Sequence, residues 1–111
     1  MKKLKIYIAS PYTKGNQAEN VRRSIDAYAE LVKEGFMPFS PLLSHFVHLV
    51  HPLPYETWLD IDFEWLHVCD AVLRLEGESP GADDEELQAI AWGIPIFYEM
   101  EDLKEWAKNQ G

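Results

Sequence analysis

Short apolar runs alternate with helical patterns four times along this 111-residue chain. The apolar runs have the length of β-strands and cover residues 4–9, 36–39, 71–75 and 94–98. Apolar spacing and capping residues predict helices over residues 16–35, over residues 55–68, from Gly81 onward and over residues 102–108. Parallel strands are joined by crossovers that are usually helical, so this alternation is typical of a parallel sheet with helices on both faces. We therefore expect an α/β fold with a sheet of four or five strands.

Residues 42–54 interrupt this alternation and allow two interpretations, a partial helix or a loop over the functional site. Three histidines recur in the segment, at His45, His48 and His51. A spacing of three residues drifts around a helix, and no cysteine or glutamate completes a familiar set of metal ligands. Surface or capping roles are therefore favoured for these histidines, and we expect no metal.

Composition and charge narrow the class of protein. The length predicts one domain over residues 1–111, and no segment reaches the roughly 18 apolar residues of a membrane span. A net charge of −9 disfavours binding to DNA or RNA polymers, which depends on Lys and Arg. The N-terminus leads directly into a strand and does not resemble a signal peptide, and the lone Cys69 agrees with a reducing compartment. We expect a cytoplasmic protein.

The loop after the third apolar run is the first candidate site. Ser79 and Pro80 lead into a helix whose first turns carry four acids: Asp83, Asp84, Glu85 and Glu86. In open α/β sheets, ligands bind at such junctions, beside the free N–H groups of the helix. An equal alternative is that these acids have no role in binding and are there because the N-terminus of a helix stabilises negative charge. Both readings stay open on spacing alone.

Asp62 is the second candidate, because it lies inside an apolar stripe. Trp58 precedes it by four residues and Trp65 follows it by three, so all three share one flank of a helix. A carboxylate on such a face is costly unless it is paired, hydrogen-bonded or turned toward a ligand cavity. A structural hydrogen bond to a backbone N–H is the competing explanation.

Three motifs together resemble the nucleoside 2-deoxyribosyltransferase superfamily. The first is the run from Ile6 to Tyr12. The second is Asp62 followed by Cys69-Asp70-Ala71-Val72, with Asp70 eight residues after Asp62. The third is Ser79-x-Gly81-x3-Glu85-x3-Ala89-x3-Gly93-x-Pro95. Each is weak alone, but their order and spacing span nearly the whole chain. The resemblance implies a single doubly wound domain of the Rossmann or flavodoxin-like kind.

The resemblance also implies cleavage of an N-glycosidic bond without a cofactor. It implies that Glu85 attacks the anomeric carbon of a 2-deoxyribose, that Asp62 supports the sugar or protonates the leaving base, and that Tyr7 orients the nucleophile. Water or a second base would then capture the sugar, giving a hydrolase or a transferase. The absence of a Gly-x-Gly-x-x-Gly or Walker-type motif agrees with a reaction free of dinucleotides and nucleoside triphosphates.

The same resemblance assigns substrate contacts. They are expected at Ser10, Pro11, Tyr12, Ser79, Gly81, Ala82 and Trp65. Trp58, Trp65 and Tyr12 could stack on a base, although core packing is commoner for tryptophans at helical spacing. The helix N-terminus stabilises a Glu85 anion by only about 0.3–1 kcal/mol. We therefore expect a hydrogen bond from Tyr7 or partial solvation at Glu85, and a raised pKa at Asp62.

Ser79 bears on the choice of substrate. Members of the superfamily that hydrolyse 2′-deoxynucleoside 5′-monophosphates carry a serine there, whereas nucleoside-specific transferases carry an acid. A hydroxyl beside free N–H groups can donate to a phosphate, which an acid would repel. The loop Ser10-Pro11-Tyr12 lacks the glycines and arginine expected around that phosphate, and Glu78 could keep some nucleoside-like character. Both substrates stay open.

The implied partner, besides a small deoxynucleoside or deoxynucleotide, is a second copy of the chain. Enzymes of this superfamily usually complete each site with residues from a neighbouring subunit, so a homo-oligomer of two or more chains is expected. A non-catalytic nucleotide-binding or sensing module on the same scaffold is the alternative. A structural protein whose aromatic residues serve an oligomer interface is a weaker one.

Overall fold

The computed structural model describes residues 3–110, apart from the side chain of His45, and contains one four-stranded parallel sheet. The strands are β1 (Lys5–Ala9), β2 (Met37–Phe39), β3 (Ala71–Arg74) and β4 (Ile96–Phe97), in the order β2-β1-β3-β4. The helices are α1 (Gln17–Lys33), α2 (His45–Val50), α3 (Tyr55–His67), α4 (Pro80–Ala91) and α5 (Met100–Ala107), with a 3-10 turn, η1, over Pro41–Ser44. The expected α/β sheet of four or five strands is confirmed.

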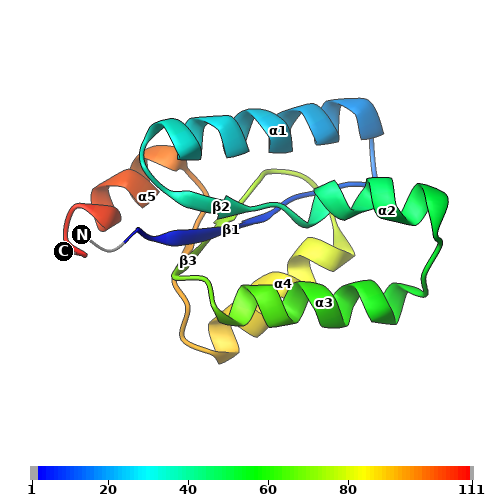
Figure 1. Cartoon of the computed structure of the whole chain (residues 1–111). Coiled ribbons are helices and arrows are strands. Elements are labelled where there is room, and N and C mark those ends of the chain that lie inside the picture. Colours follow the sequence, from blue (N-terminus) through cyan, green and yellow to red (C-terminus); the bar gives the residue numbers. More distant parts are fainter. Residues whose placement is uncertain (1–2, 111) are drawn as a thin grey trace.

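Alternating side chains of the strands build two separate cores, one on each face of the sheet. Ile6 and Ile8 of β1 point to one face and pack with Leu31 of α1 and Leu103 of α5. Tyr7 points to the opposite face, where the second core includes Leu66 of α3, Ala82 and Ala89 of α4, and Val72 of β3. Figure 1 shows the resulting layers, with α1 and α5 on one side of the sheet and α3 and α4 on the other. The helices on both faces make the sheet doubly wound.

The strand order places a topological switch between β1 and β3. From β1 the chain moves outward to β2 through α1, and it then returns through α3 to β3 on the other side of β1. The loops after β1 and β3 therefore diverge at the carboxyl edge, where open α/β sheets bind their ligands. The loop after β1 begins at Ser10, and the loop after β3 leads to α4.

Most element boundaries agree with the sequence prediction, and the differences are local. Asn16 caps α1 as expected, because its side chain accepts a hydrogen bond from the Glu19 N–H at 3.1 Å. Residues 42–54 form a partial helix, α2. The strand predicted over residues 94–98 is shorter, at Ile96–Phe97, and α5 begins at Met100 rather than Asp102. The α4 helix begins at Pro80, one residue early, because proline needs no N–H partner at a first helical position.

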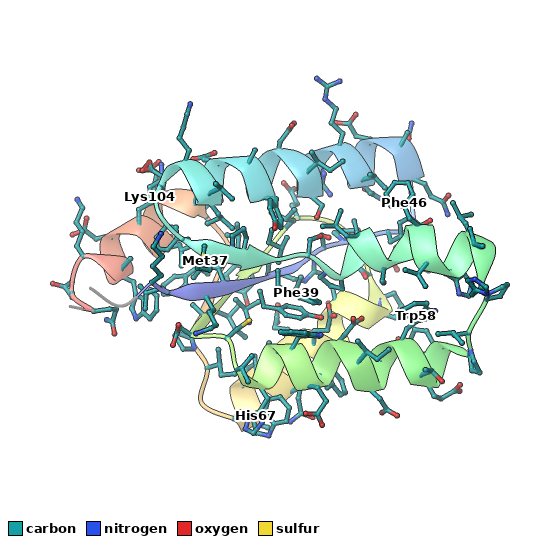
Figure 2. All side chains as sticks on the ribbon, viewed as in Figure 1. Met37, Phe39, Phe46, Trp58, His67 and Lys104 are labelled. Carbon is teal, nitrogen blue, oxygen red and sulfur yellow. The ribbon has the colours of Figure 1, made fainter. Side chains whose placement is uncertain are left out.

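The C-terminal helix is tied to α1 by ion pairs. Lys104 of α5 lies 3.1 Å from Glu30 and 3.1 Å from Glu34, near the C-terminal end of α1 (Figure 2). The attraction holds α5 over the edge of the first core, far from the switch between β1 and β3. Across the part of the chain that the structure describes, no helix has the length and apolar character that a membrane crossing requires.

Candidate active site

A cavity of about 670 Å³ opens at the carboxyl edge of the sheet. The loop after β1 contributes Ser10, Tyr12, Thr13 and Lys14 to its lining, and α4 with its preceding residue contributes Ser79, Pro80, Gly81, Ala82 and Glu85. The third wall comes from α3 and includes Tyr55, Trp58 and Asp62. Residues 41–53 supply the remaining wall, with Pro41, Leu42, Ser44, His48 and Leu53. The volume is sufficient for a small molecule of nucleotide size.

Glu85 lines the cavity and is held there by Tyr7. The Glu85 side chain is 5% exposed, and its Oε2 accepts a hydrogen bond from the Tyr7 hydroxyl. Tyr7 itself is fully buried in β1 and does not line the cavity. Asp83, two residues earlier, is largely exposed, and the helix dipole and an ion pair with Arg74 at 3.0 Å both favour an acid there. Neither explains why a glutamate is buried in the second turn.

The expected hydrogen bond from Tyr7 is therefore present, yet it does not keep the Glu85 pKa low. The pKa of the Glu85 carboxyl is raised to about 8, mainly by burial and to a smaller extent by the charge of Asp62. The Tyr7 hydrogen bond and the charge of Arg74 act in the opposite direction. Burial also raises the pKa of Tyr7 far above its ordinary range, so Tyr7 stays a phenol and remains the donor. Desolvation outweighs the local donors at this site.

Asp62 lies in the wall of the same cavity, and its raised pKa is confirmed. Burial raises the pKa of the Asp62 carboxyl to about 7, and no hydrogen bond to this side chain within residues 3–110 offsets that effect. A structural hydrogen bond to a backbone N–H therefore does not account for Asp62. The cavity brings together two carboxyl groups that both hold protons more tightly than ordinary acids. Their mutual repulsion links the two titrations.

Ser79 and Ser10 place hydroxyl groups at the two loops that meet here. The Ser79 Oγ caps α4 by accepting a hydrogen bond from the Ala82 N–H at 3.1 Å, which leaves the Ser79 O–H available to donate. The Ser10 Oγ is buried and makes no hydrogen bond with the residues that the structure describes. A buried hydroxyl without a partner is costly. Ser10 is also one of the residues that line the cavity.

Two of the predicted substrate contacts lie outside the cavity lining. Trp65 stacks on Phe39, which packs against the second core, at a ring-centroid distance of 5.4 Å. Pro11 is buried beside Gly77, whose φ of +128° allows the two loops to touch. A Cβ at Gly77 would lie 2.7 Å from the Pro11 Cγ, so this contact requires glycine. Pro11 therefore packs the two loops together.

His48 is a cavity residue whose contact the sequence did not reveal. Its Nδ1 accepts hydrogen bonds from the Trp58 Nε1–H at 2.9 Å and from the Leu53 N–H at 3.2 Å. These bonds join α2 to α3, and Trp58 points from α3 toward α2 (Figure 2). Residue spacing carries no signal for this contact, because the contact depends on the path of the chain through Pro52 and Pro54. Tyr55, Thr13 and Lys14 were also not predicted to line the site.

A family model described as a domain of unknown function, DUF7768, matches residues 4–99. The chain belongs to the DUF7768 family. A comparison of this DUF7768 sequence with curated proteins finds no match.

A solved structure resembles this DUF7768 chain in fold. It is a 2-deoxyribosyltransferase from the psychrotolerant bacterium Bacillus psychrosaccharolyticus, with a TM-score of 0.60. The two sequences are 20% identical, and the match covers 83% of this chain and 69% of the other. At this identity the likeness shows a shared architecture, which is the one that the sequence motifs implied.

The raised pKa of Glu85 predicts a measurable effect on stability. In the unfolded chain this carboxyl ionises near its ordinary pKa of about 4.3, whereas in the fold it does so at about 8. Between these values the fold binds more protons than the unfolded chain, so the free energy of unfolding decreases as the pH rises. Glu85→Gln removes this loss. At pH 8 we expect the free energy of unfolding of the variant to exceed that of the wild type by a few kcal/mol, at about 1.4 kcal/mol per unit of pKa difference.

Chemical denaturation from pH 5 to pH 8.5 measures this difference. The advantage of Glu85→Gln should shrink as the pH falls toward pH 5, because the wild-type carboxyl is then protonated in the fold and the unfolded carboxyl approaches its own pKa of about 4.3. Glu105→Gln is the matched control, because Glu105 is an exposed acid on α5. Parallel curves for wild type and Glu85→Gln would show that the Glu85 pKa is not raised.

Proposed function

We propose that this protein cleaves the N-glycosidic bond of a 2′-deoxynucleoside or its 5′-monophosphate through a glutamate nucleophile. The observation that carries the proposal is the hydrogen bond between Tyr7 and Glu85 in a cavity that Glu85 and Asp62 both line. Two carboxyl groups, one as nucleophile and one as acid, are the usual apparatus for retaining glycosyl chemistry. The fold shared with a 2-deoxyribosyltransferase supports the same class of reaction.

The proposed reaction has two steps. The Glu85 carboxylate bonds to C1′ of the sugar while the C1′–N bond breaks, and the Asp62 carboxyl gives its proton to the departing base. Tyr7 keeps its own proton and orients the nucleophile. In the second step a water molecule loses a proton to Asp62 and attacks C1′, or a second base attacks instead, and the Glu85 carboxylate is released. The first acceptor gives hydrolysis and the second gives transfer.

The substrate-binding end of the cavity suits a sugar with a polar 5′ group. The Ser79 hydroxyl is free to donate, the Ser10 hydroxyl is unpartnered among the described residues, and Lys14 brings a positive charge. These features support a monophosphate. Glu78 lies 3.8 Å from Lys14 and offsets part of that charge, which supports a neutral nucleoside. The proposal therefore covers both substrates.

A non-catalytic nucleotide-binding module is the second candidate, and one observation favours it. Burial raises the Glu85 pKa to about 8, so at pH 7 much of this carboxyl is neutral, and a neutral carboxyl is a poor nucleophile. A sensing module would bind the nucleotide with the same cavity and release no base.

Base release separates the two candidates. The protein is incubated with each 2′-deoxynucleoside and each 5′-monophosphate, and free base is measured by chromatography. Glu85→Ala should abolish turnover, and Asp62→Asn should lower kcat by roughly 10²–10⁴-fold. The reaction requires an ionised Glu85 and a protonated Asp62, so wild-type kcat should follow a bell-shaped pH profile. Asp62→Asn should lose the alkaline limb of that profile.

Asp60→Asn is the matched control, because Asp60 is an exposed acid in α3, the helix that carries Asp62. The turnover of this variant should equal that of the wild type. Retained activity in Glu85→Ala would remove the proposed nucleophile. A nucleotide that raises the melting temperature without release of base would favour the sensing module.

We further propose that the chain forms a homo-oligomer through the segment that supplies one wall of the cavity. Residues 35–55 contain no Asp, Glu, Lys or Arg, although the chain carries a net charge of −9. Apolar side chains are exposed there, including Leu49 (63%) and Val50 (71%). Two acidic copies repel each other least along an uncharged apolar surface.

Sedimentation velocity tests this assembly. The wild type should sediment as a dimer or larger species, and the double variant Leu49→Lys, Val50→Lys should sediment as a monomer. Leu87→Lys is the control, because Leu87 is an equally exposed residue on α4, and it should leave the assembly intact. A monomeric wild type at tens of micromolar would contradict the proposal.

A further inference from the structure

Arg74 is a buried cation at the carboxyl end of β3. It is 8% exposed and lies in register with Ala9 of β1, at the edge where the two site loops diverge. A buried guanidinium is costly unless its donors are satisfied. Its neighbours in the fold therefore indicate what this arginine does.

The Arg74 side chain joins the loop after β3 to the first turns of α4. Its Nη1 donates to the carbonyl of Leu75, and its Nη2 donates to the carbonyl of Gly77 at 2.9 Å. The same Nη2 donates to the Asp83 Oδ1 at 3.0 Å, and the Nε lies 3.7 Å from the Glu86 Oε1. The guanidinium thus fixes both ends of the connection that carries Ser79.

In the sequence, Glu85 lies between Asp83 and Glu86, the two acids that pair with Arg74. Asp83 and Glu86 are three residues apart and share one flank of α4, so holding both fixes the rotation of the helix about its axis. That rotation sets the direction in which Glu85 leaves the helix, toward Tyr7 of β1. The loop that Arg74 holds also packs against Pro11, because Gly77 adopts a positive φ there.

The charge of Arg74 acts on Glu85 as well. The groups that affect the Glu85 carboxyl are Tyr7 from β1, Asp62 from α3, Asp84 from α4 and Arg74 from β3. Tyr55 of α3 also lies near enough for its phenol to be affected by Glu85. Asp62 and Asp84 disfavour the Glu85 anion, whereas Arg74 favours it. In a strongly acidic chain this cation offsets part of the surrounding negative charge.

We propose that Arg74 is a positioning residue for the reaction at Glu85: its guanidinium holds the loop after β3 and the first turns of α4 in the arrangement that seats Glu85 against Tyr7. The kinetic consequences rest on the proposed function. The titration of the Glu85 carboxyl does not, because it is a property of the folded protein alone.

The test separates the geometry that Arg74 imposes from the charge that it carries. Arg74→Met removes both, and Arg74→Lys keeps a charge without the planar fork. The double variant Asp83→Asn, Glu86→Gln keeps the guanidinium and removes its two charged anchors. Lys104→Met is the control, because Lys104 holds a comparable cluster of acids away from the site.

Two quantities are measured for each protein. The first is the pH titration of the Glu85 carboxyl carbon by NMR, assigned by its loss in Glu85→Gln. The second is kcat and KM for base release. For Arg74→Met we expect the Glu85 titration to move to higher pH by about one unit, and kcat to fall by about 100-fold with KM changed less than about threefold. Lys104→Met should match the wild type in both.

The remaining variants separate positioning from charge. Arg74→Lys should restore most of the Glu85 titration while kcat stays below the wild-type value. The double variant should also lower kcat without moving the titration to higher pH. If Arg74→Met does not fold, Arg74→Lys and the double variant decide the question alone. Wild-type kcat in both of these would overturn the proposal.

An unchanged Glu85 titration in Arg74→Met would also overturn it. If the wild type releases no base, the proposed function fails but the titration still tests the role of Arg74. A shift of Glu85 in Arg74→Met and not in Lys104→Met would then support an action of Arg74 on Glu85 in a binding site. No shift would reject it there too.

Discussion

The hydrogen bond from Tyr7 to Glu85 is the interaction on which the site depends. Tyr7 is the middle residue of β1, and strand alternation turns it away from the core that Ile6 and Ile8 form on the other face. It therefore reaches the face covered by α3 and α4, where it meets Glu85. The contact links the first strand to the last crossover of the sheet. A glutamate buried at this position would otherwise leave a costly group without a donor.

Electrostatics around that contact are balanced between opposing effects. Burial and Asp62 disfavour the Glu85 anion, whereas Tyr7 and Arg74 favour it, and burial is the largest of the four. The result is a carboxyl that ionises within the range where enzymes commonly work. Residues 35–55 contain no Asp, Glu, Lys or Arg, and they supply one wall of the cavity. The charges that act on Glu85 thus come from α3, α4 and β3, and none comes from residues 35–55.

Sequence patterns predicted the features that depend on local periodicity. These include the four strands, the cap at Asn16, the helix that carries Glu85 and the raised pKa of Asp62. Long-range contacts could not be predicted in this way. The stacking of Trp65 on Phe39 and the hydrogen bonds to His48 join segments whose relative placement only the fold determines. The Arg74 network was missed for the same reason, and the Glu85 pKa depended on a depth of burial that spacing does not give.

A covalent glycosyl-enzyme on Glu85 is the most direct test of the account. The protein is incubated with a 2′-fluorinated deoxynucleoside or its monophosphate, whose fluorine slows breakdown of the intermediate by destabilising positive charge at C1′. Intact-mass and peptide analysis then locate the sugar. The account predicts one added sugar on the peptide that contains Glu85, and none in Glu85→Gln. Base release with no sugar on Glu85, or a sugar on another residue, would contradict it.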